Sequence, residues 1–435
     1  MAEFVLSDTQ RAYGESLMRF IDASPTPGHA VQTTIGMLED AGFAVIDEAE
    51  PWPTAPGRYI VVRDASLIAF ATRSTHTATS GFSIIGAHTD SPNLRLKPNP
   101  DTGRGGLAQL GVEVYGGVLL NSWLDRDLGV AGEAMVRTGN GIEPRRYRID
   151  EPLLRVPQLA IHLDREINSS GLLLNKQQHL APLWAHADAV PGGFSAYLAD
   201  TLGVMPSALV AFSAMAYDLA PSVHSGVGSA FISAPRIDNL LSCHMAVETL
   251  LRASDLATDT VPLIALFDHE EVGSSTANGA ASPLLGSVID RIGAALGATT
   301  DDLARARSRS LIVSADGAHA THPNYPDRHE PSHQVALNAG PVIKINANER
   351  YATTVRTHAA FAEAAAAVDV DIQHFVTRTD LACGSTIGPI ASTATGISAV
   401  DVGAPQLAMH SIRELCGAAD PELFHRAVLA LLTSR

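Results

Sequence analysis

The sequence predicts an α/β fold in which helices cover a mixed β-sheet, interrupted by an inserted β-rich domain. Of the 435 residues, 46% are hydrophobic and only 17% are charged, which is enough apolar material for a large core. Short, continuous apolar runs alternate with amphipathic segments, and this is typical of strands buried on both faces by helices. Between about Pro92 and Ser229 glycines become frequent and the pattern changes, which indicates the insertion.

The first elements are predicted to be helices. Ser7-Asp-Thr-Gln10 has the form of a capping box, and apolar residues at helical spacing follow it. A second helix is expected from Pro27 to the Gly42 stop.

The later elements follow from the period of the apolar residues. Six runs predict strands: Tyr59–Val62, Leu67–Phe70, Phe82–Ile85, Val261–Phe267, Ser310–Ala315 and Ile397–Val402. Four amphipathic segments predict helices: Ile237–Leu251, Leu285–Leu296, Thr357–Val368 and Pro421–Leu432. Within the insertion, the alternation at Val112–Tyr115 and the segment Leu153–Leu163 predict further strands.

The formal charge of -16 excludes several classes of partner. Such a surface repels phosphate backbones and anionic lipids, so neither nucleic acid nor membrane is an expected partner. Three cysteines cannot form a disulfide framework and fit a reducing compartment, so a cytoplasmic protein is expected. Met1 to Ser16 contains no basic stretch followed by an apolar one, and the most apolar segments are too short to span a bilayer, so neither export nor membrane insertion is expected.

His88 is the first candidate metal ligand, because Gly86-Ala-His88-Thr-Asp90 stands where an apolar strand ends. Open α/β sheets build their sites at that edge. Asp90 could orient the imidazole of His88 as a supporting carboxylate. A simple Asp–His pair in a turn is the alternative.

Two adjacent carboxylates, Glu270 and Glu271, follow the Val261–Phe267 run. In a partly desolvated cleft such a pair is costly unless a cation compensates it. One Glu can bind a metal ion while its neighbour acts as a general base. A solvated acidic turn is the alternative.

Three further residues complete a possible ligand set. Asp316 follows the Ser310–Ala315 run, Asp238 stands at the head of a helical segment, and His410 follows a strand-like run. Asp238 could instead favour the helix start through capping. Together with His88 and Glu271, these residues suggest an oxygen-rich dinuclear site of the kind hydrolases use, with metals ~3.5–4 Å apart.

Other catalytic motifs fail on local grounds. His329-Glu-Pro-Ser-His333 formally matches a zinc-peptidase motif, but Pro331 opposes the helix that this motif needs. No phosphate loop, dinucleotide fingerprint or serine nucleophile elbow is present, and Cys383 is interpreted as structural.

Taken together, the motifs resemble those of the aspartyl aminopeptidase family of dizinc metallopeptidases. The matching strings surround His88, Asp238, Glu270-Glu271, Asp316, Lys344, Cys383 and His410, and span nearly the whole chain in the family's order.

The resemblance implies roles for these residues. It places His88 and Asp316 on one zinc ion, Glu271 and His410 on the other, and Asp238 between both. It makes Glu270 the general base and Asp90 the residue that orients His88. It also implies that peptides lose an N-terminal Asp or Glu, with Lys344, Tyr351 and His319 as partners of the acidic side chain.

The resemblance also implies an architecture. Residues 1–92 and 232–435 would form the catalytic domain, and residues 93–231 an inserted dimerisation and lid domain. His162 of that domain would enter the active site of a neighbouring subunit, in a homo-oligomer expected to be a tetrahedral dodecamer.

Two competing readings remain at the level of the sequence. A related dizinc aminopeptidase with neutral-residue preference, or an amino-acid deacylase, would keep every metal ligand. The second alternative is a non-catalytic scaffold with a relict site. The presence of Glu270 disfavours it, because this residue would have no structural role in a scaffold.

Overall fold

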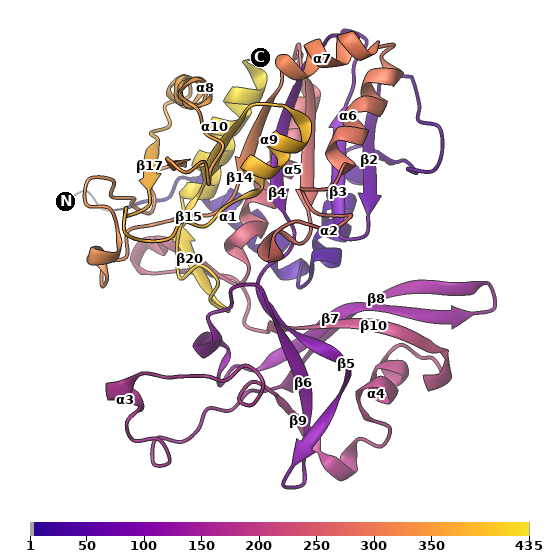
Figure 1. Cartoon of the computed structure of the whole chain (residues 1–435), viewed down its shortest axis with the longest axis vertical. Coiled ribbons are helices and arrows are strands. Elements are labelled where there is room, and N and C mark those ends of the chain that lie inside the picture. Colours follow the sequence, from indigo (N-terminus) through magenta and orange to yellow (C-terminus); the bar gives the residue numbers. More distant parts are fainter. Residues whose placement is uncertain (1–3, 435) are drawn as a thin grey trace. The chain divides into compact units, whose positions relative to one another are not determined.

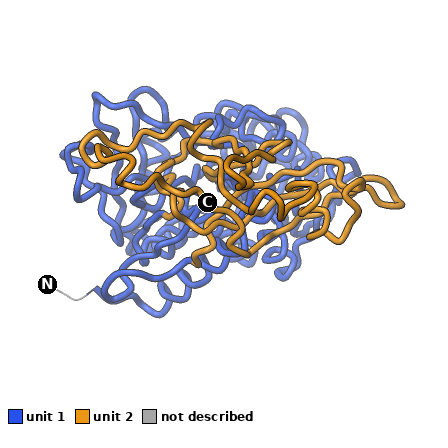
Figure 2. The backbone as a smooth tube through the Cα atoms, turned by 90° about the horizontal axis from the view of Figure 1, so that it is seen from below, with its two compact units in different colours: residues 1–90, 222–409, 414–435 blue, residues 91–221, 410–413 orange. Residues whose placement is uncertain are grey.

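The computed structural model describes residues 4–434. Its contacts divide the chain into two compact units, which Figure 2 colours separately. Unit 1 comprises residues 1–90, 222–409 and 414–435, and unit 2 comprises residues 91–221 and 410–413. The domain boundaries expected from the sequence stay a prediction.

Unit 1 is built on a nine-stranded mixed sheet (Figure 1). In spatial order its strands are β1 (Ala44–Val45), β2 (Arg58–Arg63), β3 (Ser66–Ala71), β13 (Val261–Phe267), β4 (Phe82–His88), β14 (Leu311–Ala315), β18 (Ala399–Gly403), β16 (Val342–Ile345) and β17 (Gln373–Val376). The four central strands, from β13 to β18, run parallel to one another. Their carboxyl ends therefore meet at one edge of the sheet.

Helices cover both faces of this sheet. One apolar core holds residues of α1 (Asp8–Ala23), α2 (Pro27–Asp40), α5 (Ile237–Asp255), α8 (Val355–Ala366) and α10 (Asp420–Thr433). The opposite core holds residues of α6 (Leu284–Ala295), α7 (Thr300–Ser308) and α9 (Ile387–Thr395). Ile84 and Ile85 of β4 belong to different cores, because successive side chains of a strand point to opposite faces. This burial on both faces explains the continuous apolar runs.

A smaller five-stranded sheet completes unit 1. In spatial order it contains β11 (Val223–Ser225), β12 (Phe231–Ala234), β20 (Glu414–Gly417), β19 (Pro405–Leu407) and β15 (Ala318–His319).

Unit 2 carries a six-stranded sheet in which every pairing is antiparallel. Its order is β8 (Gly141–Leu154), β7 (Leu128–Thr138), β10 (Leu209–Asp218), β5 (Asn93–Arg104), β6 (Leu107–Tyr115) and β9 (Leu183–His186). Two helices accompany it, α3 (Ile167–Ser170) and α4 (Gly193–Thr201). The unit has its own apolar core, which includes Leu94, Trp123 and Phe194.

The fold class predicted from the sequence is confirmed: a helix-covered mixed sheet accompanies a separate β-rich unit. The predicted start of α1 is also confirmed, since Ser7 and Gln10 form a reciprocal capping box.

One strand prediction is wrong over most of its length. Strand β8 ends at Leu154, and residues 155–163 form two isolated bridges, a loop and a turn. Leu159 and Leu163 are 57% and 74% exposed, so their apolar character does not reflect burial in a sheet.

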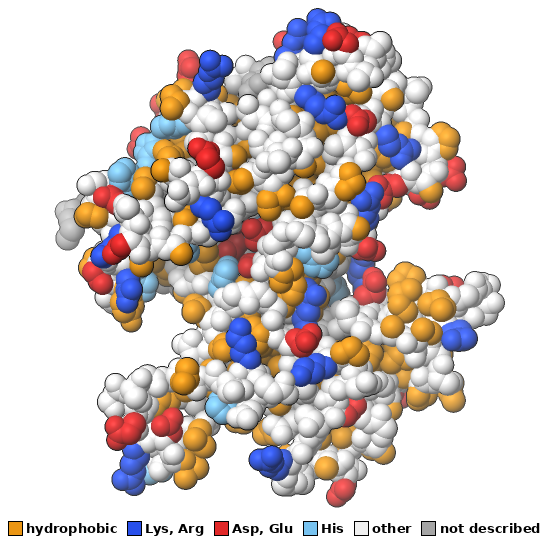
Figure 3. Space-filling model, in the orientation of Figure 1, with side chains coloured by type: hydrophobic (Ala, Val, Ile, Leu, Met, Phe, Trp, Pro, Cys, Tyr) orange, Lys and Arg blue, Asp and Glu red, His pale blue; other side chains and the backbone are white. Residues whose placement is uncertain are grey.

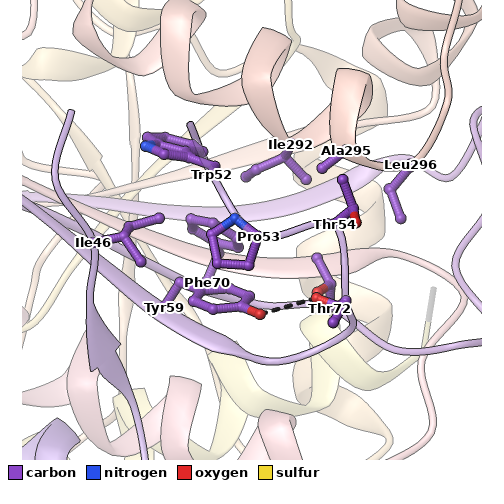
Figure 4. A pocket seen from close by; sticks show the side chains of 11 residues that line it. Ile46, Trp52, Pro53, Thr54, Tyr59, Phe70, Thr72, Ile292, Ala295 and Leu296 are labelled. Carbon is purple, nitrogen blue, oxygen red and sulfur yellow. Dashed lines mark hydrogen bonds between the residues drawn. The ribbon is translucent and has the colours of Figure 1, made fainter. Parts of the chain in front are cut away.

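No helix among residues 4–434 is both long and apolar enough to cross a membrane. A gap between Trp52, Tyr59, Phe70 and Ile292 has a volume of about 10 Å³ (Figure 4). That is room for about one water molecule, so we interpret this gap as a packing feature.

Candidate metal centre

The chemistry-bearing residues of unit 1 gather where its central parallel strands end. Phe267 of β13 lies opposite His88 of β4, and Ser314 of β14 lies opposite Gly86. The segments that follow β13 and β14 therefore start beside His88. They carry Glu270, Glu271 and Asp316.

His88 is 1% exposed and is surrounded by carboxylates. Its Nε2 lies 3.3 Å from Asp238 Oδ1, 3.5 Å from Asp316 Oδ1 and 3.9 Å from Glu270 Oε2. Burial lowers the pKa of His88, but hydrogen bonds to Asp238, Asp316 and Asp90 outweigh it and raise that pKa well above its usual value. A positive charge at this point is therefore strongly favoured.

Asp90 holds the opposite side of His88 and also the loop after β13. The backbone carbonyl of Asp90 lies 2.9 Å from His88 Nδ1, and its carboxylate Oδ1 lies 3.4 Å from the same nitrogen. The two carboxylate oxygens accept the backbone N–H groups of Glu270 and Glu271, each at 3.1 Å. Asp90 thus ties the imidazole and both glutamates to one fully buried carboxylate.

Glu270 and Glu271 begin a short 3-10 turn, Glu270–Val272, that follows β13. Burial raises the pKa of Glu270 to about 7, and the charges of Asp316, Asp238 and Asp90 act in the same direction, against His88. A carboxylate with this pKa accepts a proton more readily near neutral pH than an ordinary Glu does.

Asp238 reaches the centre from the first turn of α5. The cap position of this helix is Arg236, so capping does not account for Asp238. Its backbone N–H donates to Glu414 Oε2 at 2.9 Å, and the next residue, Asn239, donates from Nδ2 to the carbonyl of Ala315 at 2.8 Å. Glu414 and Asn239 are not among the residues predicted from the sequence, because no local motif marks either contact.

Lys344 is buried beside Asp316. It is 2% exposed and is therefore not a surface charge. Its Nζ donates to Asp316 Oδ2 at 3.3 Å and to the carbonyl of Gly317 at 3.0 Å. The same ammonium lies 5.3 Å from the ring centroid of Tyr351. His319 and Tyr351 both contact the ring of Phe375, so the three predicted substrate partners occupy one neighbourhood.

Two of the predicted site residues, His410 and His162, belong to unit 2. The residues 222–409 of unit 1 end at Met409, and His410 is the next residue along the chain. The Nδ1 atom of His410 lies 3.0 Å from the carbonyl oxygen of Gly117 in unit 2. His162 is exposed in the turn closed by the hydrogen bond from Leu163 N to Ala160 O.

The donor set of unit 1 fits divalent zinc. His88, Asp238 and Asp316 offer ligand atoms within 4.8 Å of one another, and so do His88, Glu270 and Glu271. Imidazole nitrogen and carboxylate oxygen are both zinc ligands. A group of carboxylates this close together and away from water also needs a cation to compensate its charge. The alternative peptidase motif does not form, since His329–His333 has no helix.

Known proteins are similar to this chain along almost its whole length. Residues 20–430 match the family described as "Aminopeptidase I zinc metalloprotease (M18)". The "Probable M18 family aminopeptidase 2" of Mycobacterium bovis (strain BCG / Pasteur 1173P2) is 49% identical over 430 residues, which cover 97% of this chain and 98% of that protein.

Solved structures show the same similarity. A chain of the cryo-EM structure of the Ape4 and Nbr1 complex has a TM-score of 0.93 at 36% identity, covering 98% of this chain and 87% of that chain. A chain of the S. cerevisiae mApe1 dodecamer has a TM-score of 0.84 at 28% identity, covering 97% and 96%. The match over residues 20–430 and the relative of nearly equal length show that this chain belongs to the M18 family of zinc metalloproteases and is an aminopeptidase.

Proposed function

We propose that this aminopeptidase uses two zinc ions per subunit to release an N-terminal Asp or Glu from peptides. The observation that carries the proposal is the convergence of His88, Asp238, Asp316 and Glu270 in one cluster, in which Glu270 is half-buried and the other three are buried. A cluster of this composition has the ligands of a hydrolytic metal centre and a proton acceptor beside them.

The ligands divide between two ions. His88 and Asp316 would hold the first ion and Glu271 and His410 the second, with Asp238 between both. The grouping of His88, Asp238 and Asp316 supports the first assignment. When bound, zinc supplies Lewis acidity toward a carbonyl oxygen and lowers the pKa of water.

Glu270 is proposed as the general base. Its Oε2 lies 3.9 Å from His88 Nε2, so the carboxylate borders the ligands. It takes the proton of the attacking water and gives it to the departing amine nitrogen, which leaves the released amino acid and a shortened peptide. Asp90 keeps Glu270 in place through the backbone N–H at 3.1 Å.

The acidic preference rests on Lys344. Burial of an ammonium next to Asp316 provides one local cation in a chain whose formal charge is -16. An ammonium group has three N–H donors. Two of those of Lys344 donate to Asp316 Oδ2 and to the carbonyl of Gly317, and we assign the third to a substrate carboxylate. Tyr351 and His319 are proposed to complete this subsite.

We also propose a cytoplasmic homo-oligomer, with a tetrahedral dodecamer as its form. Unit 2 exposes several large apolar side chains, notably Leu159, Ile161, Leu163 and Leu173, of which Leu173 is 91% exposed. Figure 3 colours the hydrophobic side chains that reach the surface orange. Exposed apolar groups of this kind are typical of surfaces that bind another chain. The three cysteines are free, as a reducing compartment favours.

The base assignment is tested by Glu270→Gln. We expect kcat to fall by about 10²-fold or more, because the amide cannot accept the proton, while the zinc content stays near that of the unchanged protein. Steady-state kinetics and metal analysis on the same sample separate the two effects. Retained turnover at full zinc content would contradict the role of Glu270.

The same variant tests the role of His162 in a neighbouring subunit. Glu270→Gln and His162→Ala chains, each of low activity, are dissociated, mixed and reassembled. If His162 acts in trans, the mixed assembly recovers activity, because some sites combine an intact Glu270 with an intact partner histidine. Activity no higher than that of the separate variants would place His162 outside the neighbour's active site.

Substrate choice is tested with Asp-, Glu- and Leu-terminated substrates. We expect kcat/KM to favour the acidic ones, and Lys344→Met to reduce the ratio of Asp to Leu turnover by about tenfold or more, because a charge-assisted contact is lost. The ratio is the readout, since Lys344 also contacts Asp316 and its loss affects both substrates. A preference for Leu in the unchanged enzyme would favour the neutral-residue aminopeptidase, and cleavage of N-acyl amino acids would favour a deacylase.

A further inference from the structure

Unit 2 contains a pocket that the metal centre does not use. Its volume is about 700 Å³, within the range of small-molecule sites. It is formed by the β5–β6 hairpin and the loop at 176–181, both within unit 2. Its lining comprises Lys97, Thr102, Gly103, Arg104, Gln109, Gly111, Val112, Lys176, Gln177, Gln178, His179 and Ala181.

The charge of this pocket is opposite to that of the whole molecule. Lys97, Arg104 and Lys176 line it, and none of the described residues in its lining is Asp or Glu. The whole chain carries 46 acidic and 30 basic residues, and only three of the basic ones are lysines. Two of those three lysines line the pocket. Isolated cations spread over an acidic surface would not give this grouping.

Hydrogen bonds organise the loop at 176–181 around these cations. Lys97 Nζ donates to Gln177 Oε1 at 3.1 Å, which joins the hairpin to the loop. Asn175 Oδ1 accepts the backbone N–H groups of Gln177 and Gln178, at 2.9 and 3.0 Å. Gln109 Nε2 donates to the carbonyl of Ala181 at 3.1 Å.

His179 adds a hydrogen-bond donor to the pocket lining. Its Nδ1 accepts the backbone N–H of Asn175 at 3.0 Å. With Nδ1 as the acceptor, the imidazole carries its proton on Nε2, so His179 is a hydrogen-bond donor in the pocket lining.

The nearest acid along β5 is directed elsewhere. Asp101 Oδ1 accepts the backbone N–H of Phe194 at 2.8 Å, at the start of α4. Apolar lining is limited to Val112 and Ala181, and the described lining residues include no Phe, Tyr or Trp ring on which a base could stack. The pocket therefore suits a compact, highly charged ligand better than an apolar ligand or a nucleobase.

We propose that this pocket binds a small organic anion that carries two or more phosphoryl groups. Ammonium groups pair with phosphate oxygens as point charges, and guanidinium groups donate paired hydrogen bonds to them. The cations of Lys97, Arg104 and Lys176, with the donor of His179, match several phosphate oxygens at once. Binding here is independent of peptide hydrolysis.

Isothermal titration calorimetry of the zinc-loaded full-length protein with fructose 1,6-bisphosphate tests the proposal. We expect saturable binding with one site per subunit, weakened by added KCl because ion pairs are screened. Fructose, which has the same carbon skeleton and no phosphoryl group, should not bind. The double variant Lys97→Gln/Lys176→Gln should bind at least about tenfold more weakly.

The control variant Arg137→Gln/Arg356→Gln removes the same charge from exposed positions outside the pocket and should bind like the unchanged protein. Aminopeptidase activity and zinc content, measured for each variant, show that the fold and the metal centre are intact. Equal loss in both double variants would show a non-specific effect of charge and overturn the proposal. Stronger binding of tricarballylate than of the bisphosphate would overturn the phosphoryl assignment, and binding of neither anion would overturn the site.

Discussion

At the scale of single residues, the metal centre depends on Asp90 as much as on its ligands. One carboxylate accepts the N–H groups of both Glu270 and Glu271, and the carbonyl of the same residue lies 2.9 Å from His88 Nδ1. A contact from this carbonyl fixes the imidazole with Nε2 toward the carboxylates. Asp90 is therefore a positioning residue for three side chains.

Replacement of Asp90 by Asn is expected to weaken zinc binding by about 10- to 100-fold. The amide keeps one acceptor, but its NH₂ group must face a backbone N–H of Glu270 or Glu271. Competition with a chromophoric chelator measures the affinity. The exposed Asp259→Asn is the control for loss of one negative charge and should leave zinc binding unchanged. Equal zinc affinity in the two variants would show that Asp90 does not position the centre.

At the scale of elements, the position of Asp316 depends on a close approach between two strands. Gly403 ends β18, next to the end of β14, and a Cβ atom on it would lie 1.8 Å from the carbonyl oxygen of Asp316. Real Cβ contacts are much longer, so any side chain there displaces the segment that carries Asp316.

We expect Gly403→Ala to lower the free energy of unfolding by about 1–3 kcal/mol and to reduce the zinc content as well. Chemical denaturation and metal analysis measure the two effects. Gly286, inside α6, has open space around its Cβ position, so Gly286→Ala should leave zinc binding unchanged and stabilise the helix by about 0.5–1 kcal/mol. Full zinc content in Gly403→Ala would show that the strand end tolerates the methyl group.

The sequence predicts elements well where burial sets the pattern. Strands β4, β13 and β14 are buried along their length, so their apolar runs have one interpretation. The strand predicted over Leu153–Leu163 is wrong beyond Leu154, because Leu159, Ile161 and Leu163 are exposed and their apolar character does not reflect burial in a sheet. Contacts such as Asn239 to Ala315 join residues 76 positions apart, and no local periodicity encodes them. The same holds for the pocket in unit 2, which unites residues of a hairpin and a distant loop.

At the scale of the whole molecule, the buried acids couple metal binding to stability and pH. Without a cation, protons must compensate the charge of the cluster. Burial raises the pKa of Glu270 to about 7, from an ordinary value of 4.5, and the neighbouring carboxylates raise that of His88 against the effect of burial. In the metal-free chain the folded state therefore binds more protons than the unfolded state near pH 6.

The metal-free protein loses stability as pH rises. Between about pH 4.5 and 7 the unfolded chain releases the proton of Glu270 while the folded chain keeps it, so metal-free stability falls as pH rises through this window. The contribution of His88, present below its ordinary pKa, is lost in the same direction at higher pH. Bound zinc replaces these protons and removes most of the loss.

We therefore expect chelation of zinc to lower Tm, by about 10 °C at neutral pH if zinc is present at ~1,000 times its Kd, and by less at pH 5.5. Differential scanning fluorimetry of zinc-loaded and chelated protein between pH 5.5 and 8 measures the gap. In chelated Glu270→Gln, Tm should depend less on pH below 7, because the amide mimics the protonated acid and cannot titrate. If the difference in Tm between zinc-loaded and chelated protein stays constant or becomes smaller as pH rises, the charge of the acids is compensated by something other than protons and zinc.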